Sequence, residues 1–204
     1  MDFRRRKSGE EGGLSAPKVP VYGPRVTSET TRYVALLRGI NVGRARQVDM
    51  PRLREVLTDR GHGAVRTHLR SGNVVLESPL PEPELARELT AAIAAEFGLD
   101  VPVIVRTAAE LAAVLATDPF GSIATDPSRY SVTFLPREPG SDLVAALPPA
   151  DGGEYRVAGR ELYLWLPEGL SNSPMGAWKW DRLLGVPGTN RNWNTVSKLA
   201  ELAG

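Results

Sequence analysis

Three short clusters of Arg, Gly and Asn follow apolar stretches of the chain. They lie in residues 33–41 (YVALLRGIN), 67–75 (THLRSGNVV) and 189–196 (TNRNWNTV). Arg and Asn side chains are costly to bury without hydrogen-bond partners, so such clusters either brace loops or contact a ligand. Glycine permits close approach to the backbone, and backbone amides beside a guanidinium can hold a carboxylate or a phosphate. The clusters therefore predict where an anion would bind.

The predicted site draws on all three clusters. In the expected fold, the loop after the first strand and the hairpin between the second and third strands lie at one edge of a sheet. Thr189 and Asn190 are expected to cap the last helix, whose free N-terminal amides also favour an anion. The alternative stays open, in which the asparagines bond local backbone and Arg38 braces the loops. The predicted ligand-binding residues are Arg38, Gly39, Asn41, Ser71, Gly72, Asn73, Arg191, Asn192 and Thr195.

The sequence contains no recognisable catalytic motif, so it decides neither for nor against an enzyme, and no catalytic residue is assigned. With 0 cysteines, thiolate catalysis and cysteine metal sites are excluded. His62 and His68 are too isolated for a metal triad, and Ser71 lacks the strand–turn–helix context of a nucleophile elbow. We therefore expect no metal and no cofactor.

The elements that must position these residues begin at residue 32. Short apolar runs predict strands over residues 33–37, 65–69, 73–77 and 101–105. Pro51 opens a helix that stops at Gly61, and Pro81 and Pro83 open another that stops at Gly98. The order βαββαβ predicts a ferredoxin-like unit.

Residues 107–204 read as a looser copy of this unit. Helical patterns cover residues 108–115, 142–147, 178–184 and 193–202, and strand patterns cover 131–135, 154–157 and 161–166. This gives an additional helix at each end and no obvious last strand. The predicted fold class is α+β, with two ferredoxin-like (α/β-plait) halves built on antiparallel sheets.

Composition predicts how the chain is divided and where it works. Residues 1–31 are polar and aperiodic and are expected to form a disordered extension, followed by plaits over residues 32–106 and 107–204. Lys and Arg number 25 against 24 Asp and Glu, so the overall charge favours no partner. No apolar run is long enough for a membrane span and no signal peptide is evident, so a cytoplasmic location is expected.

Three motifs in order resemble a known bacterial family. They are LLRGINVG (residues 36–43), VRTHLRSGNVV (65–75) and TNRNWNTVSKL (189–199). The chain is similar, from about Tyr33 to Leu202, to the family catalogued as domain of unknown function 1697. The resemblance implies an α+β structure of two ferredoxin-like plaits. It implies no activity.

The sequence-based prediction of function is a binding module for a small anionic ligand, such as a phosphorylated metabolite, through the Arg and Asn loops. Nucleic acid as the ligand has little support, because residues 73–77 carry no aromatic side chains that could stack on bases. Two alternatives stay open. One is an enzyme that acts on an anionic substrate by positioning and electrostatics, and the other is a protein-interaction module that uses open sheet edges.

Overall fold

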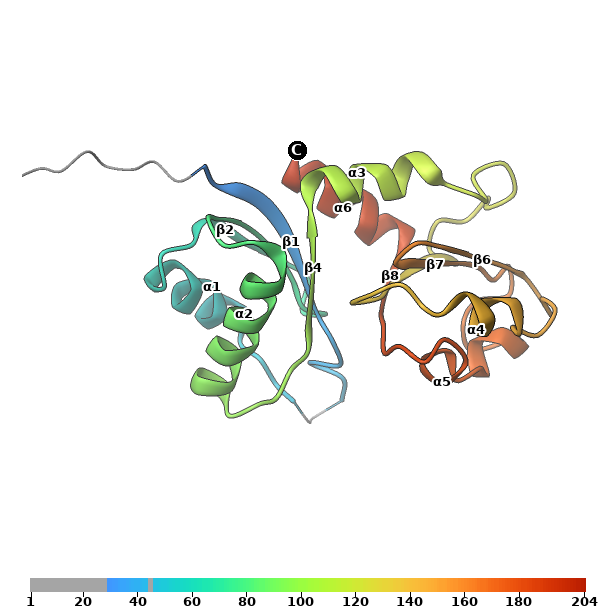
Figure 1. Ribbon diagram of the computed structural model, residues 1–204, viewed down its shortest axis with the longest axis horizontal. Helices are drawn as coiled ribbons and strands as arrows, with labels where there is room; N and C mark the ends of the chain where they lie inside the picture. The colour runs from blue at the N-terminus through green and yellow to red at the C-terminus, as the bar shows by residue number, and fades with distance from the viewer. Residues whose placement is uncertain (1–28, 44–45) are drawn as a thin grey trace, which may run out of the picture.

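Two four-stranded antiparallel sheets, each packed against helices, make up the structure (Figure 1). The computed structural model describes residues 29–43 and 46–204. The expected disordered extension therefore lies outside the described residues up to residue 28, and the first strand begins at Thr31. The prediction of an α+β protein built on two antiparallel sheets is confirmed.

The first sheet has the strand order β2-β3-β1-β4. Local signals in the sequence fix its helices: the Asp49 side chain accepts the Arg52 N–H to cap α1, and Gly98 ends α2 in the left-handed conformation. The elements of this half are β1 (Thr31–Leu37), α1 (Met50–Asp59), β2 (Gly63–His68), β3 (Asn73–Ser78), α2 (Glu82–Phe97) and β4 (Val103–Thr107).

The second half repeats this topology, with strand order β6-β7-β5-β8. A helix, α3, joins the halves, and the segment between β7 and β8 holds only the 3-10 turn η1 and the short helix α5. The elements are α3 (Ala108–Thr117), β5 (Tyr130–Phe134), α4 (Ser141–Ala145), β6 (Glu154–Ala158), β7 (Glu161–Trp165), η1 (Pro174–Ala177), α5 (Trp180–Leu183), β8 (Thr189–Asn192) and α6 (Trp193–Ala203).

Strand β8 corrects two of the expectations above. The second half does have a last strand, which pairs with β5 in antiparallel register. Thr189 and Asn190 belong to this strand and do not cap α6; the cap is Asn192, whose side chain accepts the Thr195 N–H. Sequence periodicity did not reveal strand β8. Its buried positions are Thr189 and Arg191, so it lacks the apolar alternation that marks a strand.

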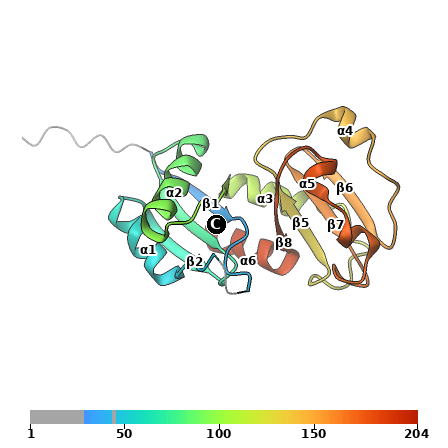
Figure 2. The same ribbon diagram turned by 90° about the horizontal axis from the view of Figure 1, so that it is seen from below.

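Helices α3 and α6 lie between the two sheets, as the views in Figures 1 and 2 show. The central core joins Val34 and Leu36 of the first sheet to Val132 and Phe134 of the second, through side chains of both helices. A second core lies under α1 and α2, and a third lies under α4, η1 and α5. The central core therefore belongs to both halves at once.

A buried arginine of the second half crosses to the first. Arg191 of β8 is 8% exposed, and its guanidinium donates to oxygens at the end of β1 and in the β2–β3 hairpin. Its remaining donors bond within β8. Its acceptors in the first half are the carbonyl oxygens of Leu37 (2.8 Å), Gly72 (3.0 Å) and Ser71 (3.1 Å) and the amide oxygen of Asn73. We call this contact the Arg191 bridge.

A second arginine makes the same contact in the opposite direction. Arg106 of β4 is 1% exposed and donates to the carbonyl oxygen of Leu135, the residue after β5, at 2.7 Å. It also donates to Arg160 O in the β6–β7 hairpin at 3.2 Å and to the Glu161 carboxylate at 2.8 Å. We call this contact the Arg106 bridge.

The two bridges occupy equivalent positions in the repeated topology. Leu37 N–H donates to Gly72 O, and Leu135 N–H donates to Arg160 O, both at 2.9 Å. Each arginine thus bonds the oxygens beside one such pair in the opposite half. They differ in charge, because Arg106 pairs with a carboxylate whereas the oxygens around Arg191 are neutral. Burial lowers the pKa of Arg191 to about 10, which still leaves it charged at neutral pH.

We predict that Arg191→Ala destabilises the protein by about 3 kcal/mol or more, because several buried oxygens lose their donor together. Arg38→Ala is the matched control: this arginine also joins the halves, but its side chain is 37% exposed, so its loss should cost about 1 kcal/mol or less. Urea denaturation of both variants measures the difference. Equal losses would contradict the structural role assigned to Arg191.

The sequence-based division at residue 106 stays a prediction, and we propose that the halves depend on each other to fold. A fragment of residues 29–107 would expose Val34, Leu36 and Ile104, which α3 and α6 cover in the whole chain. We expect the fragment to show no cooperative thermal transition by circular dichroism, while residues 29–204 melt in one step. A cooperative melt of the fragment would show that the first half is an independent domain.

Candidate functional site

The structure brings part of the predicted site together between the two halves. Arg191 contacts Ser71, Gly72 and Asn73 through the Arg191 bridge. The Asn73 amide also donates to His68 O at 2.8 Å and to the Ser71 hydroxyl at 3.2 Å. All three nitrogens of the Arg191 guanidinium donate to protein oxygens. The hydrogen bonds at this cluster hold the two halves together.

Glycine is required in the β2–β3 hairpin. Gly72 has φ +84°, and a Cβ there would lie 2.8 Å from side-chain atoms of Leu37 and Ile40. Gly39 also has a positive φ, +66°, but the space around it is open. Close packing therefore requires glycine at position 72, whereas at position 39 only the backbone conformation does.

The other predicted residues form local contacts. Asn41, at φ 54°, donates through its amide to Val48 O and Arg70 O and accepts the Val48 N–H, so it fastens its loop to the hairpin. Asn192 accepts both the N–H and the hydroxyl of Thr195, at 2.9 and 2.8 Å. A ligand role for the nine predicted residues stays a prediction, and the contacts seen match the bracing alternative.

Arg38 contacts a different part of the second half. Its Nε donates to Gly188 O at 2.9 Å, and its Nη2 forms an ion pair with Asp181. The other carboxylate oxygen of Asp181 accepts the Gly188 N–H at 3.1 Å. Arg38 thereby neutralises an acidic group that the second half would otherwise expose.

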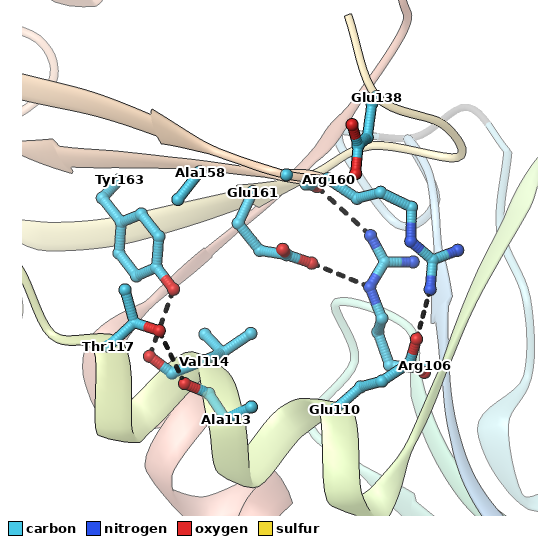
Figure 3. A pocket seen from close by; sticks show the side chains of 11 residues that line it. Arg106, Glu110, Ala113, Val114, Thr117, Glu138, Ala158, Arg160, Glu161 and Tyr163 are labelled. Atoms are coloured by element: carbon cyan, nitrogen blue, oxygen red, sulfur yellow. Dashed lines mark hydrogen bonds and ion pairs between the residues drawn. The ribbon is translucent and has the colours of Figure 1, made fainter.

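A pocket of about 240 Å³ lies beside the Arg106 bridge, between α3 and the β6–β7 hairpin (Figure 3). The Arg160 guanidinium bonds both carboxylate oxygens of Glu82, at 2.5 and 3.2 Å, and one oxygen of Glu110. Arg106 forms an ion pair with Glu161. The two arginines are therefore neutralised by carboxylates, and this pocket is not suited to an anion.

Two ionisable groups of this pocket, Glu110 and Tyr163, have shifted pKa values. Burial opposes ionisation of Glu110, but the N–H and hydroxyl of Thr107 and the guanidinium groups of Arg160 and Arg106 outweigh it, so the pKa of Glu110 is lowered. Burial raises the pKa of Tyr163 to about 12, so its phenol keeps its proton at neutral pH. The pKa values of Glu110 and Tyr163 are thus both moved away from 7, the range that suits a general base at neutral pH.

A second cavity, of about 390 Å³, lies over the outer face of the second sheet, where η1 and α5 cover it incompletely. The apolar residues of its lining are Leu164, Leu170, Trp178 and Trp180. The polar and charged residues of its lining are Thr133, Lys179, Asp181, Arg182 and Asn190. We call this the tryptophan cavity.

The tryptophan cavity has cations without carboxylate partners. Neither Lys179 nor Arg182 forms an ion pair with any residue in the part of the chain that the structure describes, and both are exposed. Asp181, the acidic residue between them, is already paired with Arg38. The cavity therefore carries an excess of positive charge beside an apolar wall.

Sequence reasoning missed both hollows. Arg106 had a detectable signal: an arginine followed at once by a helix-capping residue occurs both at Arg106–Thr107 and at Arg191–Asn192. The tryptophan cavity had a partial signal in the clustered Trp178 and Trp180, but its other lining residues come from η1, α5, three strands and connecting loops that only tertiary packing brings together. Among residues 29–43 and 46–204, no group of acidic or His side chains is arranged to hold a metal, and no helix could cross a membrane.

Comparison with known proteins agrees with this fold. The solved structure of the conserved bacterial protein SP0830 from Streptococcus pneumoniae is similar, with a TM-score of 0.69 and 23% identity, over 86% of this chain and 100% of that one. At this identity the likeness shows the fold alone. No curated protein matches the sequence. The family model described as "Protein of unknown function (DUF1697)" matches residues 30–163, well over half of the chain, and the chain therefore belongs to this family.

Proposed function

We propose that this protein binds a small anionic ligand, of the phosphorylated-metabolite type, in the tryptophan cavity. The observation that carries the proposal is the pair of uncompensated cations, Lys179 and Arg182, on a cavity of about 390 Å³. Pockets for small molecules typically measure 300–1,000 Å³ and combine apolar walls with a few polar groups. The tryptophan cavity has this size and this composition.

The predicted Arg and Asn clusters supply only part of the cavity and its surroundings. The guanidinium of Arg191 donates through all three nitrogens to protein oxygens, and Arg106 is buried and paired with the Glu161 carboxylate, so neither is placed to bind an anion. Arg38 contributes indirectly: it pairs with Asp181 and so offsets the negative charge that would repel an anion. Asn190, from the third cluster, lies on the cavity wall.

Binding is favoured over catalysis by the side chains of the wall. Among the described residues that line the cavity, Thr133 alone bears a hydroxyl, which accepts a hydrogen bond from the Asn190 amide at 2.9 Å. The carboxylate of the described lining, Asp181, is engaged by Arg38 and Gly188 and so is not placed to activate this hydroxyl. A cytoplasmic location stays part of the proposal and suits a phosphorylated ligand.

We expect millimolar pyrophosphate or citrate to raise the melting temperature of residues 29–204. A ligand at 100 times its Kd stabilises by about 2.7 kcal/mol, which is roughly 5 °C or more for a chain of this size. The double variant Lys179→Gln, Arg182→Gln should lose most of the shift, and high salt should reduce it in wild type. Arg54→Gln is the matched control, since it removes an exposed cation from α1, away from the cavity.

The proposal fails if no anion shifts the melting temperature. It also fails if Arg54→Gln reduces the shift as much as the cavity variant does, because the effect would then reflect net charge alone. Strongly salt-dependent retention of DNA or RNA, unchanged in the cavity variant, would assign the ligand to nucleic acid at another surface.

A further inference from the structure

We infer that the ligand of the tryptophan cavity is a planar heteroaromatic ring joined to a phosphate, as in a nucleoside monophosphate. This inference rests on the proposed function and specifies its ligand class. It is drawn from the residues that line the cavity, which combine two tryptophans with an amide and two cations.

The aromatic wall is held in place before any ligand arrives. The rings of Trp178 and Trp180 lie 5.2 Å apart, and Tyr155 packs edge-on against both, at 6.1 and 5.4 Å between centroids. The Trp180 indole N–H donates to Met175 O at 3.1 Å. Side chains fixed in this way lose little conformational entropy on binding. Aromatic side chains present faces on which a planar ring can stack.

Leu170 adds exposed apolar surface to the cavity lining. Leu170 is 55% exposed and belongs to the cavity lining, where its backbone packs tightly against Gly176. A Cβ at Gly176 would lie 1.8 Å from Leu170 O, so the loop carrying Leu170 is pressed against η1. A ring that enters between Leu170 and the tryptophans would bury this surface and gain the corresponding hydrophobic free energy.

The polar lining residues include groups for both the ring and the phosphate of such a ligand. One polar end of the Asn190 amide is fixed by the hydroxyls of Ser131 (3.0 Å) and Thr133 (2.9 Å). Its other polar atom has no partner among the described residues and is available to the polar edge of a heteroaromatic ring. An amide held in this way is suited to hydrogen-bond discrimination between rings.

The charge of the cavity matches a phosphate monoester. Lys179 and Arg182 supply two positive charges that no carboxylate in the described part of the chain neutralises. A phosphate monoester carries about 1.5 to 2 negative charges at pH 7. A polyanion without a ring would match the cations but leave the aromatic wall in water, and an uncharged nucleoside would match only the wall.

The test compares four probes by calorimetry and by quenching of tryptophan fluorescence on the full-length protein: AMP, UMP, ribose 5-phosphate and adenosine. We expect AMP or UMP to bind at least about tenfold more tightly than ribose 5-phosphate, the gain that one stacked base supplies. Adenosine should bind more weakly than AMP by a similar factor, because it lacks the phosphate.

Two variants assign the gain in affinity to the aromatic and to the charged residues of the cavity. Trp178→Leu should reduce the affinity for the nucleotide about tenfold and leave the affinity for ribose 5-phosphate unchanged, which a merely unfolded variant could not do. Lys179→Gln with Arg182→Gln should abolish the advantage of AMP over adenosine. Arg54→Gln should change neither.

The outcomes separate this inference from the proposed function. If pyrophosphate and ribose 5-phosphate bind as tightly as AMP and UMP, the anion site stands and the ring is overturned. If none of the anions binds, both the inference and the proposed function are overturned. If AMP binds but Trp178→Leu has no effect on its affinity, the aromatic wall is not where the ring lies, and the inference is overturned.

Discussion

Two buried guanidinium groups set the relation between the halves of this chain, and the rest of the structure depends on them. Each arginine lies at the last strand of one sheet and bonds the backbone oxygens at the end of the first strand of the other. Burying an ion is costly unless its donors are met by acceptors. Both arginines meet that requirement only when the two halves lie in this one arrangement. The bridges therefore specify the arrangement as well as stabilise it.

The bridges also place the two central helices. The residues that follow Arg106 and Arg191 are Thr107 and Asn192, and each caps the helix that begins next to it. Helices α3 and α6 consequently start where the halves meet and run between the sheets, where their apolar faces fill the central core. The repeat of strand, arginine, cap and helix accounts for the layered shape seen in Figure 1.

The two halves differ where the candidate site lies. In the first half, the 16 residues of α2 cover the outer face of the sheet. The corresponding segment of the second half has η1 and α5, with 4 residues each. The shorter cover leaves a cavity lined by tryptophans and by cations without ion-pair partners among the described residues, and Arg38 of the first half pairs with Asp181 of its lining. A cavity at this place follows from an incomplete copy of the same topology.

Most of the fold could be predicted from the sequence, because its elements carry local signals. Gly98 ends α2 as expected, and the hairpin at residues 70–72 joins β2 to β3. Strand β8 could not be found by pattern, since its inward side chains are Thr189 and Arg191. Arg106 was expected to follow a strand over residues 101–105, whereas β4 covers Val103–Thr107 and buries it.

The candidate site was less accessible to sequence reasoning. The Arg and Asn clusters contain polar side chains that meet in the structure, but whether they brace or bind depends on which acceptors surround them. For Arg191 the acceptors outside β8 come from residues more than 100 positions away in the chain. The tryptophan cavity depends on the placement of side chains from separate elements, which no local pattern encodes.

The claim that the bridges make one cooperative unit is tested most directly by native-state hydrogen exchange. The amides to compare are those of Val34 in β1 and Val132 in β5, which lie in the two sheets and share the central core. The account predicts that both exchange with the same free energy, equal to that of global unfolding. Exchange at Val132 with a distinctly lower free energy than at Val34 would show that the second half opens alone, and would contradict it.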